Sequence, residues 1–230
     1  VRSGRVRAIY FEKRFGRRAD AVFPPVCLDL GEEGKVLIEG MIDRVDILSV
    51  PSSDRTYVRV IDYKSGSDRF DMDEVKSGFR LQLMLYLKGA MGGIGEAVPA
   101  GVFYFRISDA MADVSGVPAA GVEEAVHKKV SGSAKLDGVL LNEEDVIESM
   151  DSGFSGYSGI IPVSKNRDGV LSGRTLLTEE EFSDLIAEND ANLAQTAEKF
   201  LSGCADIDPK KGKNTDACRY CGYRSICNIK

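Results

Sequence analysis

The 230-residue sequence has no apolar run long enough to cross a membrane, and its N-terminus does not resemble a signal peptide. An initial methionine is also missing. The chain opens VRSGRVRAIYF, and we interpret it as part of a longer protein. Histidine occurs once, as His127 in the polar stretch VEEAVHKK, where we expect a surface residue rather than a metal ligand. These absences favour a soluble, cytoplasmic protein.

Acidic residues outnumber basic ones, 36 to 30, and the formal net charge of −6 argues against bulk attraction to nucleic acid. The first 18 residues differ, because they contain seven basic side chains and a single acid, Glu12. Such a basic edge can follow a phosphate backbone, although a run of charges is more often a solvated face. Hydrophobic content of 43% is ordinary for a globular protein.

Hydrophobic periodicity predicts strands and helices in an order typical of an α/β fold with a mixed sheet. The expected strands are 5–15, 35–48, 56–64 and 100–108, and the expected helices are 73–90, 142–150 and 178–202. We expect 35–48 and 56–64 to pair as an antiparallel hairpin. The predicted division is a core over 1–108, a loosely organised insertion over 109–178, and a C-terminal helix with a cysteine-bearing tail over 179–230.

The strand RVIDYKSG raises the first functional question, because it ends with Asp62 and Lys64 two positions apart. Side chains alternate along a strand, so both charges share a face with Val58 and Val60. A strand-end ion pair facing solvent is one interpretation. In the other, Asp43 of the preceding strand lies beside Asp62, and the two carboxylates hold Mg²⁺ or Mn²⁺. Lys64 then faces the same ion.

The expected helix after this strand contributes Gln82 and Tyr86, which are four residues apart and therefore on one face. A glutamine within LQLMLYL needs hydrogen-bond partners if it is buried. Neighbouring backbone groups could satisfy it, or it could bind water or phosphate at the site.

Five cysteines are present, and Cys218, Cys221 and Cys227 form a C-x2-C-x5-C arrangement near the C-terminus. Three clustered thiolates suggest a soft metal centre but are one short of a closed site. We expect Cys27 and Cys204 to be ordinary small buried residues.

Three motifs together resemble the RecB-like PD-(D/E)xK nucleases: G-M-I-D-R at 40–44, I-D-Y-K-S-G at 61–66 and Q-L-M-L-Y at 82–86. The resemblance implies a restriction-endonuclease-like fold, with Asp43 and Asp62 as metal ligands and Lys64 as the catalytic lysine. It implies supporting roles for Gln82 and Tyr86. Arg44 and Asp46 resemble structural neighbours that form ion pairs beside the site.

The tail segment YRSIC and the long insertion resemble the AddB branch of these helicase–nucleases. That resemblance implies DNA exonuclease activity in break repair and an AddA-type helicase–nuclease partner subunit. It also implies a [4Fe–4S] cluster whose fourth cysteine, like a histidine-bearing first helix, lies upstream of Val1. We therefore expect the cluster to be absent or incomplete in this chain, and the missing first helix could leave the isolated chain inactive. A Cas4-like nuclease and a catalytically idle iron–sulfur DNA-binding clamp are the alternatives.

Overall fold

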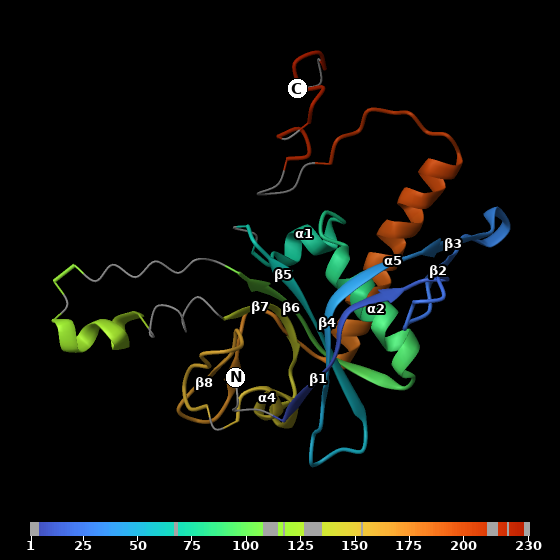
Figure 1. The fold of residues 1–230 in the computed structure, drawn as a ribbon. Coiled ribbons are helices and arrows are strands. Elements are labelled where there is room, and N and C mark those ends of the chain that lie inside the picture. The colour runs from blue at the N-terminus through green and yellow to red at the C-terminus, as the bar shows by residue number, and fades with distance from the viewer. Residues whose placement is uncertain are drawn as a thin grey trace.

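A computed structural model describes residues 5–66, 69–107, 115–116, 118–126, 135–152, 154–210, 216–219 and 221–227. His127 lies outside these ranges. No helix among the described residues is both long and apolar enough to span a membrane. The centre of the structure is a mixed six-stranded sheet with helices packed against it, as Figure 1 shows.

The sheet has the order β1-β4-β5-β6-β7-β10. Its strands are β1 (Val6–Phe15), β4 (Gly40–Leu48), β5 (Thr56–Lys64), β6 (Ala97–Arg106), β7 (Leu136–Leu141) and β10 (Leu176–Leu177). Strand β5 pairs antiparallel with β4 and parallel with β6, so the predicted hairpin and mixed sheet are confirmed. Two further pairs lie outside this sheet: β2 (Val26–Asp29) with β3 (Lys35–Ile38), and β8 (Ser164–Lys165) with β9 (Leu171–Ser172).

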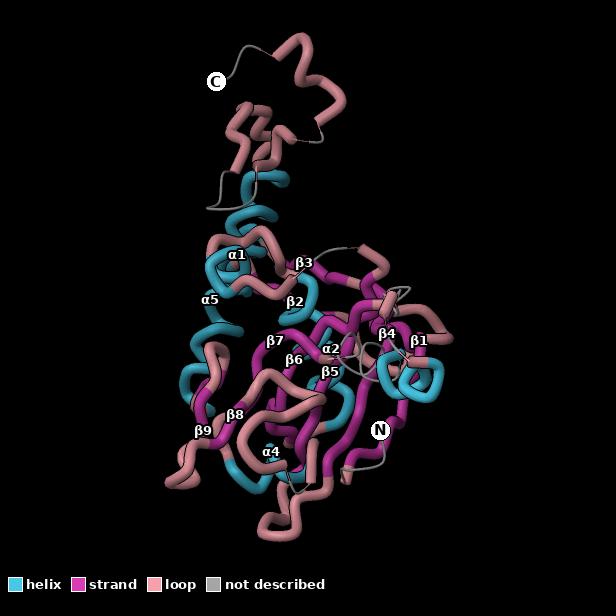
Figure 2. Tube along the Cα trace, turned by 90° about the vertical axis from the view of Figure 1, so that its left-hand side faces the viewer, coloured by secondary structure: helices cyan, strands magenta, loops and turns pink. Residues whose placement is uncertain are grey.

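The helices are α1 (Met72–Lys76), α2 (Gln82–Ile94), α4 (Glu144–Met150) and α5 (Glu179–Leu201), with short 3-10 turns η1 (Gly31–Glu33) and η2 (Ala119–Gly121). Helix α2 contacts β4, β5 and β6, and α5 contacts α2 and β6. Figure 2 shows α5 running along the side of the sheet. Leu83 and Leu87 on α2 are fully buried, and each such side chain contributes roughly 1.5–3 kcal/mol of hydrophobic stabilisation.

Two predicted elements are each divided in the structure. The strand expected over 35–48 breaks at Glu39, because β3 pairs with β2 whereas β4 pairs with β1. The helix expected over 73–90 breaks after α1, where Gly78 has a φ of +77° and the amide of Phe79 bonds to the carbonyl of Glu74. A positive φ is accessible to glycine at little cost, so the chain turns here and restarts its helix at Gln82.

The long helix α5 begins where the sequence predicted, because its N-terminus carries a complete capping box. The hydroxyl of Thr178 accepts a bond from the amide of Glu181, and the Glu181 carboxylate accepts one from the amide of Thr178. The backbone amides of Thr178 and Glu181 have no partner within the helix, and these two bonds satisfy both of them.

The segment 109–178 differs from a loosely organised insertion in the part that the structure describes. Strand β7 pairs with β6, β10 pairs with β7, and α4 packs against β4 and β7. Val139, Leu140 and Ile147 are fully buried in the same core as β5 and β6. The helix predicted over 142–150 is confirmed as α4, whereas the short strands β7 and β10 carry too weak a periodicity to be assigned from sequence, yet they complete the sheet.

Candidate active site

The two predicted carboxylates lie on one face of the sheet. Arg44 is opposite Ile61 and Val45 is opposite Val60, so one further step along this antiparallel register places Asp43 opposite Asp62. Directly opposed residues of an antiparallel pair project to the same side. The Asp43 carboxylate accepts a hydrogen bond of 2.9 Å from the backbone amide of Tyr63, which fixes it beside the end of β5.

Lys64 also lies on this face and is held by two side chains. Its ammonium Nζ lies 2.7 Å from Oδ2 of Asp62 and donates a 2.9 Å hydrogen bond to Oε1 of Gln82. The Asp62 side chain is only 4% exposed, and that of Lys64 is 23% exposed. Removing a carboxylate from water this far is unfavourable unless a cation accompanies it, and here Lys64 supplies one.

Gln82 and Tyr86 continue the same chain of hydrogen bonds. The Gln82 amide donates a 2.7 Å bond to the hydroxyl of Tyr86, so Gln82 joins Lys64 to Tyr86. Burial raises the pKa of the Tyr86 phenol, and the negative charges of Asp62 and Asp43 raise it further. The glutamine that stood out in an apolar helix is therefore satisfied by side chains that come from two different elements.

Tyr104 on β6 is a neighbour of the site that the sequence did not single out. It lies opposite Asp62 in the parallel register of β5 and β6, and the Lys64 ammonium is 5.3 Å from its ring centroid. Burial raises the pKa of its phenol, while a hydrogen bond from Arg80 opposes that shift. Arg80 is itself paired with Glu74 on α1. A tyrosine in an aromatic strand carries no sequence signal that distinguishes this role from core packing.

Arg44 and Asp46 form ion pairs on the other face of the sheet, away from Asp43. The Asp46 carboxylate is fully buried and lies 2.7 Å from Nε of Arg44 and 2.8 Å from Nε of Arg59. Arg59 is 3% exposed and Arg44 is 25% exposed, so Asp46 and Arg59 form a buried pair with Arg44 at its edge. Its position supports the structural role expected of Arg44 and Asp46, and adds Arg59 to it.

The donor set at Asp43 and Asp62 suits a hard divalent cation. Both ligands are carboxylates, and Asp62 is buried where a cation would offset its charge. Among the described residues, no group of three or more His, Cys, Asp or Glu side chains is arranged to hold a metal. The pair would therefore leave the remaining coordination positions to water and substrate oxygens.

The C-terminal cysteines lie near one another in the described part of the tail, because the charges of Cys221 and Cys227 both act on the Cys218 thiol. Cys218, Cys221 and Cys227 form no disulfide, and among the described residues no group of three or more His, Cys, Asp or Glu side chains is arranged to hold a metal. Burial is the main cause that raises the pKa of the Cys218 thiol, and Asp216 adds to it. Figure 1 shows the tail extending beyond the end of α5.

The two remaining cysteines are not buried, and the expectation for them was wrong. Cys27 and Cys204 are both exposed. Cys27 occupies an outward position of β2, whose residues alternate between buried and exposed. Cys204 follows the end of α5, where its sulfur contacts the carboxylate of Asp206.

Comparison with known proteins agrees with this geometry. The sequence profile of the PD-(D/E)XK nuclease superfamily matches residues 1–228. The chain belongs to this superfamily. Its six-stranded mixed sheet with flanking helices is the expected α/β architecture.

Curated relatives extend the comparison. The chain is 38% identical over 233 residues to the B subunit of the ATP-dependent helicase/deoxyribonuclease of Clostridium novyi (strain NT), covering 99% of this chain and 20% of that protein. Proteins of the same name from Alkaliphilus oremlandii (strain OhILAs) and Clostridium kluyveri (strain NBRC 12016) are each 34% identical over 100% of this chain and 20% of their own length. The chain thus spans about a fifth of the relatives it matches.

Proposed function

We propose that this superfamily domain hydrolyses DNA phosphodiester bonds with a divalent metal ion, Mg²⁺ or Mn²⁺, held by Asp43 and Asp62. One observation carries the proposal. Two carboxylates and a lysine from adjacent strands face a single helix, and the helix residue Gln82 is hydrogen-bonded to that lysine. The names of the relatives supply the substrate class, deoxyribonucleic acid.

The metal would polarise a phosphoryl oxygen and activate the attacking water. Lys64 places a positive charge beside the metal ligands, where negative charge develops on the phosphate during hydrolysis. Gln82 fixes the position of the lysine, and Tyr86 fixes the orientation of the glutamine amide. The site therefore works by positioning and charge, without a covalent intermediate.

In the larger protein, we propose exonuclease activity beside an AddA-type helicase–nuclease subunit during repair of broken DNA in the bacterial cytoplasm. The similarity to helicase/deoxyribonuclease B subunits over the whole chain supports this assignment rather than a Cas4-like nuclease. An idle DNA-binding clamp would have no need for the Lys64–Gln82–Tyr86 chain, which favours an active enzyme. Any [4Fe–4S] cluster in the larger protein would draw on Cys218, Cys221 and Cys227.

A cleavage assay tests the proposal. Labelled single-stranded DNA is incubated with the protein in Mg²⁺ or in EDTA, and the products are separated by length. We expect cleavage in Mg²⁺ only, and its loss in Asp62→Asn. Asp145→Asn is the matched control, because Asp145 lies on α4 beside the β4–β5 turn, at the opposite end of β5. Equal cleavage by wild type and Asp62→Asn would refute the assignment.

A further inference from the structure

Basic side chains continue from Lys64 across the neighbouring strands of the sheet. In the parallel register, Arg106 on β6 lies opposite Lys64, and the amide of Ile107 bonds to the carbonyl of Lys64 at 2.8 Å. Phe105 pairs with Leu136 on β7, so one more step places Lys135 opposite Arg106. Residues paired in this way project to the same face, which gives the series Lys64, Arg106 and Lys135.

Arg106 differs from other partly or fully buried arginines of the sheet and its helices. Arg44 and Arg59 are paired with Asp46, and Arg80 is paired with Glu74. The Nε of Arg106 is buried, yet within the described part of the chain it has no hydrogen-bond partner. Nη1 of Arg59 also lacks a partner, but the Arg59 guanidinium has its ion pair with Asp46. A buried donor without an acceptor is costly, so the position calls for an acceptor that is not part of these residues.

A cavity of about 610 Å³ lies next to this series, beyond β7. Its lining includes Arg69, Arg174 and Tyr157, whose side chain is 72% exposed. The ammonium of Lys135 sits 3.6 Å from the ring centroid of Tyr157, which connects the basic series to the cavity. Asp137 also lines the cavity, but its carboxylate accepts a 2.9 Å hydrogen bond from the amide of Phe70.

Asp137 indicates how near this cavity is to the candidate metal ligands. It lies opposite Tyr104, which lies opposite Asp62. Two strand spacings separate Asp62 from Asp137, or about 10 Å. The cavity is therefore close enough to receive the part of a nucleic acid strand that flanks a bond positioned at Asp62.

We propose that the DNA strand being cut crosses the carboxyl end of β5 and β6 toward this cavity, with Arg106 binding the phosphate next to the scissile one. Arg69 and Arg174 bind phosphates further along, and Tyr157 stacks on a base. The inference rests on the proposed nuclease function. Guanidinium groups match phosphate oxygens in geometry and charge, and aromatic rings bind single strands without sequence preference.

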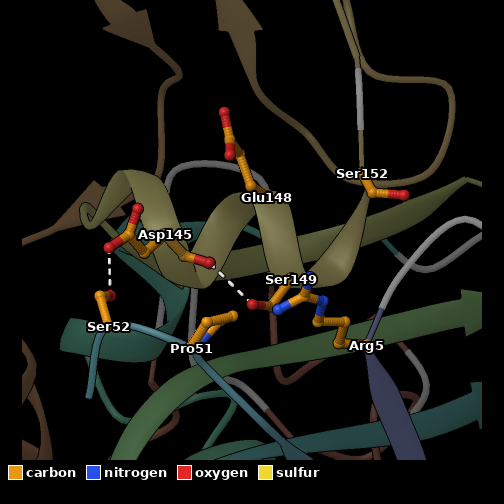
Figure 3. Close-up of a pocket in the computed structure, with 7 residues that line it drawn as sticks. All are labelled: Arg5, Pro51, Ser52, Asp145, Glu148, Ser149 and Ser152. Atoms are coloured by element: carbon orange, nitrogen blue, oxygen red, sulfur yellow. Dashed lines mark hydrogen bonds between the residues drawn. The ribbon is translucent and has the colours of Figure 1, made fainter.

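The pocket of Figure 3 is a weaker candidate for the same strand. It lies between the start of β1, the β4–β5 turn and α4, and its lining combines Arg5 with the carboxylates of Asp145 and Glu148. Two acids against one base repel a phosphate backbone. The pocket also lies at the opposite end of β5 from Asp62.

The salt dependence of binding tests this path. Affinity for labelled oligothymidylate is measured in EDTA, where metal-dependent cleavage is prevented, over a series of salt concentrations. Each lost phosphate contact should reduce the slope of log K against log salt by about 0.7. We expect this reduction in Arg106→Gln and in Arg174→Gln, whereas Arg106→Lys should keep the wild-type slope. Arg55→Gln is the matched control, because Arg55 pairs with Glu179 near the other end of β5.

Wild-type slopes in Arg106→Gln would overturn the proposal. If a thermal melt reveals that Arg106→Gln is unfolded, the test uses the exposed residues Arg69 and Arg174 instead. Unchanged salt slopes in both Arg69→Gln and Arg174→Gln would then overturn the proposal. Cleavage assays in Mg²⁺ distinguish a failure of the strand-path proposal from a failure of the proposed nuclease function. An active wild type with unchanged slopes refutes the strand path alone, whereas an inactive wild type with reduced slopes in the variants refutes the nuclease function alone.

Discussion

The Lys64 ammonium lies 2.7 Å from the Asp62 carboxylate, although the two residues are separated along the chain by Tyr63. Strand alternation brings them together on one face, while Tyr63 turns to the other, where its hydroxyl is 3.5 Å from Nη1 of Arg44. The same alternation therefore separates a candidate catalytic pair from the buried ion pairs that support the sheet. Each face can be tested by its own substitutions.

Lys64→Ala should reduce the rate of DNA cleavage by about 100-fold or more, because a preorganised charge at the reacting phosphate is removed. Metal affinity should change little, since the carboxylates remain. The measurement is single-turnover cleavage over a range of Mg²⁺ concentrations. Lys88→Ala serves as the control, because Lys88 is on α2 and pairs with Asp190 of α5. Wild-type rates in Lys64→Ala would mean that the lysine is misassigned.

Gln82→Ala and Tyr86→Phe should lower the cleavage rate less than Lys64→Ala, because both act through the lysine. Losing one such hydrogen bond typically costs about 0.5–1.5 kcal/mol, or up to about tenfold in rate. The double variant should be less impaired than the two single effects combined, since both changes break one chain of contacts. Fully additive losses would indicate that the two residues act independently.

Asp46→Ala should destabilise the protein by roughly 3–5 kcal/mol, because Arg59 would be left buried without its counter-charge. Urea unfolding of the variant measures this loss. Glu179→Ala provides the comparison, since it breaks the exposed Arg55–Glu179 pair and should change stability little. Equal effects of the two substitutions would contradict the structural role of the Asp46 ion pairs.

Much of this architecture could be predicted from sequence, because it depends on the spacing of residues that are close together along the chain. Strand parity placed Asp62 and Lys64 on one face, the expected hairpin brought Asp43 beside them, and helical spacing placed Gln82 with Tyr86. The hairpin followed from two apolar runs around a turn.

Other features depend on pairing between distant segments, which periodicity does not reveal. Strand β7 carries a short apolar run, and only its partner β6 identifies it as part of the sheet. Tyr104 and Arg106 became visible as neighbours of Asp62 and Lys64 only through the register of two strands that are far apart in sequence. The break at Gly78 was missed because the apolar spacing continues across it.

Alkaline titration tests the burial of two tyrosines near the site. Burial raises the pKa of both Tyr86 and Tyr104 above the ordinary value for tyrosine, so their phenols should ionise at a higher pH than a free tyrosine does. A pKa raised by folding gives stability that is present below about pH 10 and is lost as the pH rises toward the folded value. Tyr86→Phe should therefore lose less stability above pH 10 than wild type. The difference in phenolate absorbance between wild type and Tyr86→Phe follows this one phenol, and urea melts measure stability. Ionisation of the Tyr86 phenol at or below the ordinary pKa of tyrosine would contradict the account.

Direct measurement of Mn²⁺ binding tests the central claim, that Asp43 and Asp62 together hold a divalent ion. Electron paramagnetic resonance distinguishes free from bound Mn²⁺ during a titration of the protein. We predict one site per chain in wild type, and marked weakening of that site in Asp43→Asn and in Asp62→Asn alike. Lys64→Ala should retain it. Unchanged Mn²⁺ binding in both asparagine variants would contradict the account.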